Sequence, residues 1–85
     1  MKIELDLPEY DGNAVDVIWT NDSFFSVTQT GELIILKANQ KALITFAKQM
    51  LYLAVNDFPN GAHVHYDSFF TKLENSSPEF VIEKI

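Results

Sequence analysis

The residues of this sequence that are best suited to chemistry lie in one short segment, GAHVHYD at 61–67. It holds two histidines one residue apart, His63 and His65, followed by Asp67. On a strand, side chains two positions apart point to the same side with Cα atoms about 6.6 Å apart, so both imidazoles can approach one metal ion. Asp67 lies about 13 Å from His63 along a straight strand, so the three side chains do not share one ion.

A zinc ion held by His63 and His65 needs a further ligand from a neighbouring strand. The last segment, 79–85, supplies Glu79 and Glu83 if it pairs with the histidine strand. The same proximity permits a cross-strand hydrogen bond or ion pair between histidine and glutamate. A metal site of His63, His65 and Glu83 therefore stands as the alternative to a polar strand surface, and we expect no cofactor.

The motifs of common catalytic sites are missing from the sequence. The chain has no cysteine, and so no thiol nucleophile, disulfide or thiolate metal site. It also has no Gly-x-Ser-x-Gly motif and no glycine-rich phosphate loop. Serine, histidine and aspartate occur in almost any chain, so their presence alone assigns no catalysis. We therefore expect a protein that is not an enzyme.

The charge of the chain constrains its partners. Twelve acidic residues face six basic ones, all lysine, for a formal net charge of −6. Arginine is the usual bidentate reader of phosphates and base edges, and the chain has none, so we expect no nucleic-acid partner. Seven of the acids, Asp16 among them, precede residue 33. An acidic face attracts a basic protein, although solubility alone also explains it.

Hydrophobic periodicity predicts strands on both sides of one helix. Alternation, or a short apolar run bounded by turn residues, indicates a strand. The run 33–36 is apolar on both sides, which favours the middle of a sheet. The predicted strands are 2–7, 15–20, 24–28, 32–38, 62–67 and 79–85, with a turn at 11–13.

The predicted helix begins after Asn39, a residue type that caps helices well, and continues to about Asn56. No glycine or proline interrupts it. Its large apolar residues recur at the spacing of one helix face, so we expect them in the core, with Thr45 on the opposite side. The predicted apolar stripe is Leu43, Phe46, Ala47, Met50, Leu51 and Ala54.

These elements predict an α+β fold, a mostly antiparallel sheet of four to five strands with one long helix packed on one face, in the order βββ(β)-α-ββ. A helix about 10 Å wide cannot cover both faces of such a sheet, so one face stays open. An open face that mixes apolar and acidic side chains predicts a protein interface or a homodimer. If Val64 and Tyr66 point to the helix, the open face carries His63, His65, Asp67, Glu79, Val81, Glu83 and Ile85.

The length of 85 residues indicates a single domain, 1–85. No apolar stretch approaches the roughly 20 residues of a membrane span. The N-terminus shows strand-like alternation rather than the apolar run of a signal peptide. We therefore expect a cytoplasmic protein without a membrane partner.

Three blocks of the C-terminal half form a characteristic order. They are ANQKALITFAKQMLYLA at 38–54, NDFPNGAHVHYD at 56–67 and SSPEFVIEKI at 76–85. The helix block is generic, whereas the spacing of Gly61, His63, His65 and Asp67 before the final strand is more specific. In these blocks the chain resembles the bacterial Immunity protein 32 family, which belongs to polymorphic toxin systems.

This resemblance implies a non-enzymatic inhibitor that binds a cognate toxin domain and neutralises it. The acidity of the chain suits a basic toxin such as a nuclease. Two alternatives stay open: a small homodimerising structural or regulatory domain, and a His-x-His metal-binding module. The expected partner-binding residues are His63, His65, Asp67, Glu79, Glu83 and Asp16.

Overall fold

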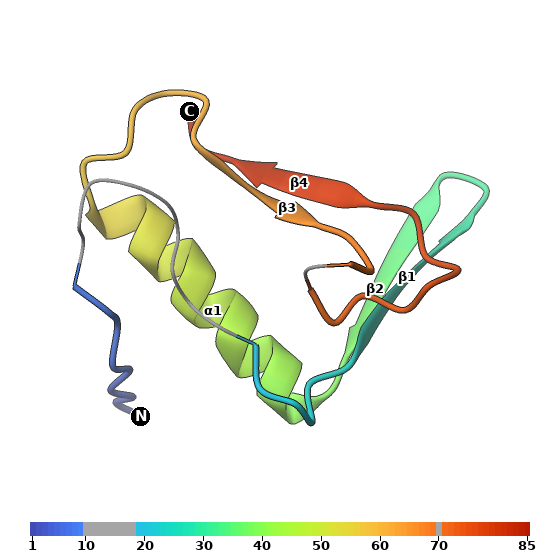
Figure 1. Cartoon of the computed structure of the whole chain (residues 1–85), viewed down its shortest axis with the longest axis horizontal. Coiled ribbons are helices and arrows are strands. Elements are labelled where there is room, and N and C mark those ends of the chain that lie inside the picture. The colour runs from blue at the N-terminus through green and yellow to red at the C-terminus, as the bar shows by residue number, and fades with distance from the viewer. Residues whose placement is uncertain (10–18, 70) are drawn as a thin grey trace.

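The computed structural model describes residues 1–9, 19–69 and 71–85. Its elements are β1 (Phe25–Thr30), β2 (Leu33–Ala38), α1 (Gln40–Val55), β3 (His63–Tyr66) and β4 (Phe80–Glu83). Along the chain α1 lies between the two strand pairs, and Figure 1 shows the C-terminus close to the connection that follows α1. The predicted α+β class is confirmed, and the strand order matches in outline with one helix between strand pairs.

The first strand pair, β1–β2, is an antiparallel hairpin in which Phe25 lies opposite Ala38 and Thr30 opposite Leu33. Gly31 lies in the turn with a φ of 62°, a conformation that glycine adopts without the clash a Cβ would cause. Both strands were predicted, and the structure extends the first of them to Thr30.

The strands form two two-stranded antiparallel sheets rather than the predicted single sheet of four to five strands. The reason lies at the outer edge of β1, where the β3–β4 connection takes the positions that a third strand needs. Leu73 bridges Phe25, and the Glu74 N–H donates to the Phe25 carbonyl at 2.9 Å. The Val27 N–H donates to Ser77 Oγ, also at 2.9 Å. This closure leaves β2 as an edge strand, so its predicted central position was wrong.

The strand predicted at the N-terminus, 2–7, is absent from the structure. Residues 2–7 alternate like a strand but form none in the structure, because alternation defines two faces without supplying a partner strand. Leu7 instead packs against a buried cluster at the end of α1. The predicted turn 11–13 and most of the predicted strand 15–20 lie outside the described residues, and Trp19 and Thr20 are not in a strand.

The start of α1 is fixed by Asn39, as predicted. Its side-chain carbonyl accepts from the Ala42 N–H at 3.0 Å, which satisfies one of the free donors of the first turn. The same oxygen accepts from the Phe24 N–H at 3.2 Å, and the amide donates to the Asp22 carbonyl at 2.8 Å. Asn39 therefore joins the helix start to the chain that enters β1.

Changing Asn39 to alanine is expected to lower the free energy of unfolding by about 1 kcal/mol, since the cap and both tethers are lost. Urea denaturation followed by circular dichroism measures this loss. Gln40→Ala is the control, because Gln40 is exposed and begins the same helix. Equal effects of the two substitutions would contradict the capping role.

The helix buries a different face from the one predicted. Leu43, Met50 and Leu51 are exposed, whereas Phe46 is buried as expected. Two polar residues in the buried face have partners: Gln49 accepts from Tyr66 Oη at 2.7 Å, and Thr45 Oγ1 donates to the Lys41 carbonyl. Because these groups are satisfied, a stripe that is only partly apolar can face the core. The buried helix residues are Ala42, Thr45, Phe46, Gln49, Tyr52 and Leu53.

The core is rich in aromatic rings contributed by α1 and by both hairpins. Tyr66 and Phe80, opposite each other on β3 and β4, stack with ring centroids 4.6 Å apart. Phe25 packs edge-on against Phe46 at 4.9 Å and stacks on Trp19 at 4.7 Å. A second cluster of Tyr52, Leu53 and Phe58 closes the other end of the helix. The two strand pairs therefore share no sheet, and they are held together by these side chains and by the bonds from the β3–β4 connection to β1.

In the part of the chain that the structure describes, α1 is not long and apolar enough to cross a membrane, and it is the one helix there.

Candidate functional site

The outer face of β3 and β4 carries the histidine segment. His63 lies opposite Glu83 and His65 opposite Val81 in an antiparallel register. All four of these residues are exposed. Their neighbours in the strands turn inward, as predicted, and these are Val64, Tyr66, Phe80 and Ile82. Because side chains alternate along a strand, burial of the second set places the first on the open surface.

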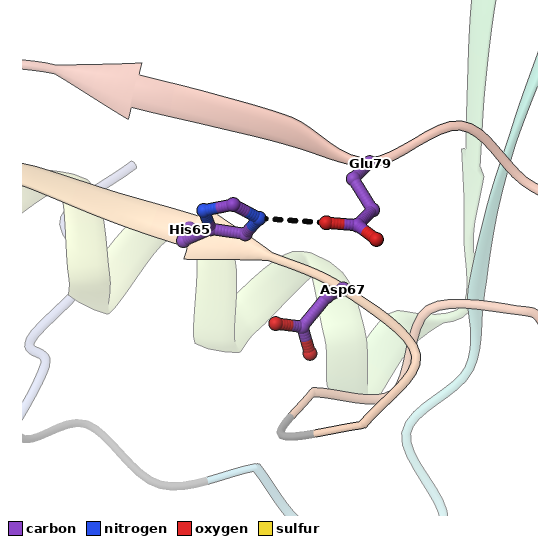
Figure 2. A group of neighbouring side chains, drawn as sticks. All are labelled: His65, Asp67 and Glu79. Carbon is purple, nitrogen blue, oxygen red and sulfur yellow. Dashed lines mark hydrogen bonds and ion pairs between the residues drawn. The ribbon is translucent and has the colours of Figure 1, made fainter.

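His65, Asp67 and Glu79 form a compact cluster at one end of this face. Figure 2 shows the three side chains, which offer ligand-type atoms within 4.8 Å of one another. His65 Nε2 lies 2.9 Å from Glu79 Oε1. A carboxylate only accepts, so the imidazole donates its Nε2–H in this contact. Glu79, which lies just before β4, thus reaches His65 through one of the two arrangements expected for that glutamate.

Asp67 is fixed by the turn that follows β3. Its carboxylate accepts from the Phe69 N–H at 3.0 Å, and its carbonyl accepts from Thr71 Oγ1. An aspartate that bonds the backbone two residues ahead is typical of a tight turn. The turn fixes the carboxylate next to His65, two positions before it, and His63, four positions before it, does not join the group.

His63 has a partner outside the cluster. Its Nδ1 lies 3.1 Å from the Gly61 carbonyl, which requires the proton on Nδ1 because a carbonyl only accepts. Gly61 has a φ of 92°, and its N–H donates to the Lys84 carbonyl at 2.8 Å. The two histidines therefore have different partners, and among the described residues Glu83 and His63 do not join the three-residue cluster. Asp16 lies outside the described residues.

The cluster is suited to two kinds of chemistry. In the first, His65 and Glu79 form an ion pair. The side chain of His65 is 50% exposed and that of Glu79 is 63% exposed, so the pair contributes about 0–1 kcal/mol to stability. As a metal site, one imidazole and two carboxylates match the ligands of first-row divalent cations. Metal binding would require His65 Nε2 without its proton, and so would replace the bond to Glu79. In either use these groups lie at the surface, with His65 and Glu79 exposed and Asp67 half-buried.

A second group of exposed apolar residues lies on β2 and α1. Ile34 and Leu36 in β2 are exposed, and so are Leu43 and Met50 in α1, which were expected in the core. Their hydrophobicity alone could not reveal this, because an apolar run looks the same in a buried strand and in an unpaired one. Exposed apolar groups of this size mark candidate interaction surfaces.

Two acidic side chains stabilise the turns that flank β1. A hydrogen bond from the Thr20 hydroxyl lowers the pKa of Asp22, and bonds from Ser76 lower the pKa of Glu74. Glu74 also lies where the β3–β4 connection bonds Phe25. These carboxylates serve local structure rather than the histidine face.

Comparison with protein families gives a match over much of the chain. The model of the family described as Immunity protein 32 matches residues 34–85, more than half of the chain. The matched region begins in β2 and includes α1, β3 and β4. Comparison with curated proteins gives no match, and neither does comparison with solved structures.

Proposed function

Since this chain belongs to the Immunity protein 32 family, we propose that it is an immunity protein that binds a cognate bacterial toxin domain and neutralises it in the cytoplasm of the cell it protects. The family match over residues 34–85 is the observation that carries the proposal. Inhibition of this kind needs a complementary surface and no catalytic group, so the protein acts by binding rather than as an enzyme.

The outer face of β3 and β4 is the surface we assign to the toxin. It lies inside the matched region and presents exposed polar side chains around Val81, which is 46% exposed. An apolar centre with a polar rim is the usual anatomy of a protein interface. The rim consists of His63, His65, Glu79 and Glu83, with Asp67 at one end.

The charge of the chain supports a basic toxin, such as a nuclease. With a net charge of −6, the inhibitor accelerates encounter with a positively charged partner and helps to orient it. Asp16, among the residues expected to contact the toxin, would add to this field. If charge steers binding, the association rate falls as salt is added. An association rate unaffected by salt would exclude this electrostatic part while leaving inhibition itself intact.

The test begins with a pull-down by the tagged full chain from its native host, followed by mass spectrometry. Recovery of a toxin-bearing protein, whose lethality in a bacterial host the full chain suppresses when the two are co-expressed, supports the proposal. Recovery of only the chain itself would contradict it.

Once the toxin is in hand, Val81→Lys is expected to weaken its binding at least about tenfold, because a charge replaces the apolar centre of the face. Val55→Lys is the matched control: Val55 is 67% exposed at the end of α1, and the substitution makes the same change in net charge. Titration calorimetry with the purified toxin domain measures both. Equal weakening by the two substitutions would move the interface away from β3 and β4.

A further inference from the structure

One edge of the β1–β2 hairpin is closed and the other is open. On the outer edge of β1, Phe25 and Val27 bond the β3–β4 connection through Glu74 and Ser77. On the outer edge of β2, no other segment of the described chain forms a hydrogen bond with Ile34 or Leu36. The described residues 1–9, 19–69 and 71–85 thus cover one edge of the β1–β2 hairpin and leave the other edge available.

The register shows which backbone groups point out of the open edge. In an antiparallel pair, residues directly opposite each other either exchange both hydrogen bonds or both point away. Val27 uses its N–H outward, and its opposite residue is Leu36. Two positions along the same ladder, Ile34 lies opposite Gln29. The N–H and C=O groups of Leu36 and Ile34 therefore point away from β1.

The side chains at this edge are apolar as well. Ile34 is 65% exposed and Leu36 is 45% exposed, and the residues between Glu32 and Lys37 carry no charge. Natural proteins usually protect an edge strand with charged side chains, proline, a bulge or a covering segment. An edge with free backbone groups and apolar side chains matches one kind of ligand, another extended strand.

We propose that β2 pairs antiparallel with β2 of a second copy of this chain and forms a four-stranded sheet across a two-fold axis. In the register that the outward groups allow, Ile34 of each copy lies opposite Leu36 of the other. These two residue pairs exchange four backbone hydrogen bonds. Ile35 then faces its own counterpart at the axis, so the interface uses the same patch on both copies, as a two-fold dimer requires.

Charge favours a second copy at this edge over a basic partner. In the two-fold register Lys37 lies opposite Leu33 and Glu32 opposite Ala38, so no like charges face each other. The acidic and imidazole side chains of the candidate toxin surface lie on β3 and β4 and beside them, not on β2. A basic toxin therefore has no electrostatic reason to select the β2 edge. Dimerisation goes beyond the proposed function and is tested without a toxin.

Sedimentation equilibrium of the full chain, from micromolar to millimolar concentration, is the first test. A mass that rises from the monomer's 9.7 kDa toward twice that value is expected. Ile34→Lys should raise the dissociation constant at least about tenfold, because it puts a charge into the apolar edge. Leu43→Lys, at an exposed apolar residue of α1, makes the same charge change and should leave the constant unaltered.

Two further measurements address the backbone. Leu36→Pro removes an outward N–H that β1 does not use, so the hairpin keeps its hydrogen bonds while the dimer weakens. Should either substitution unfold the chain, amide hydrogen exchange of the unaltered protein still decides, because the amides of Ile34 and Leu36 gain protection with concentration only if β2 pairs. A monomer at every concentration overturns the proposal. So does a dimer that Leu43→Lys disrupts and Ile34→Lys does not.

Discussion

Replacing Phe25 with alanine should lower the free energy of unfolding by about 3–5 kcal/mol. Phe25 is fully buried, and its ring contacts Trp19, Phe46, Tyr66 and Phe80 at centroid distances of 4.7 to 6.4 Å. Truncation leaves a cavity that no single neighbour can fill, because the surrounding rings come from different elements. A chain of this size has about 4–13 kcal/mol of total stability, so the loss is a large share of it.

The adjacent residue provides the control. Phe24 is 51% exposed, and its described tether to Asn39 runs through the backbone N–H, which alanine keeps. Phe24→Ala should therefore cost less than about 1 kcal/mol. Urea denaturation can be followed by the fluorescence of Trp19, the chain's single tryptophan, which stacks on Phe25. Similar losses for the two variants would show that the aromatic cluster does not carry the stability assigned to it.

Tyr66→Phe should lower the free energy of unfolding by about 1–3 kcal/mol. The Tyr66 hydroxyl donates to Gln49 Oε1 at 2.7 Å, and both residues are buried. Phenylalanine keeps the stacking on Phe80 but withdraws this donor from a buried acceptor, which costs more than the mean value of a hydrogen bond. Tyr52→Phe is the comparison, because its hydroxyl bonds the carbonyl of the exposed Glu9. If Tyr52→Phe lowered the free energy of unfolding as much as Tyr66→Phe or more, the larger contribution assigned to the bond between Tyr66 and Gln49 would be wrong.

The same tyrosine gives a pH dependence with a definite sign. Burial raises the pKa of Tyr66 above its ordinary value of 10.0. The hydroxyl therefore stays protonated in the folded chain at pH values where the unfolded chain has lost that proton. Its contribution to stability is complete below pH 10 and declines as the pH rises through the folded pKa. Tyr66→Phe lacks this decline, so the stability gap between the two proteins should narrow above pH 10. A constant gap from neutral to strongly alkaline pH would contradict this assignment.

Much of the local structure could be predicted because it depends on neighbouring residues. Asn39 and the helix after it were identified from capping chemistry and from the lack of glycine and proline. The inward and outward faces of β3 and β4 followed from the period of two, since Val64 and Tyr66 are apolar and His63 and His65 are polar. The tertiary arrangement depends on distant partners. The predicted apolar stripe of the helix was wrong in part, because its pattern gives no sign of Tyr66. The Tyr66 hydroxyl donates to the buried Gln49, so that a polar residue lies in the core while Leu43 is exposed.

The candidate site, like the fold, could be predicted only in part. Contact between a histidine and a glutamate of the last strand follows once both strands are placed, and Glu79 was one of the two candidates. The position of Asp67 depends on a turn whose bonds to Phe69 and Thr71 leave little trace in the sequence. The single sheet failed for a similar reason, because nothing local shows that the β3–β4 connection would occupy the edge of β1.

That connection also affects how the chain folds as it is synthesised. The bond between Val27 and Ser77 spans 50 positions, and the entropy of closing so long a loop must be overcome before the contact stabilises anything. The β1–β2 hairpin and α1 can form from local contacts as the ribosome releases them. Neither edge of that hairpin is paired with another described segment until residues 73–77 have been synthesised. The nascent chain therefore exposes both edges of the β1–β2 hairpin until the β3–β4 connection has been made. Among the described residues, that connection then covers the edge of β1 and leaves the edge of β2 open.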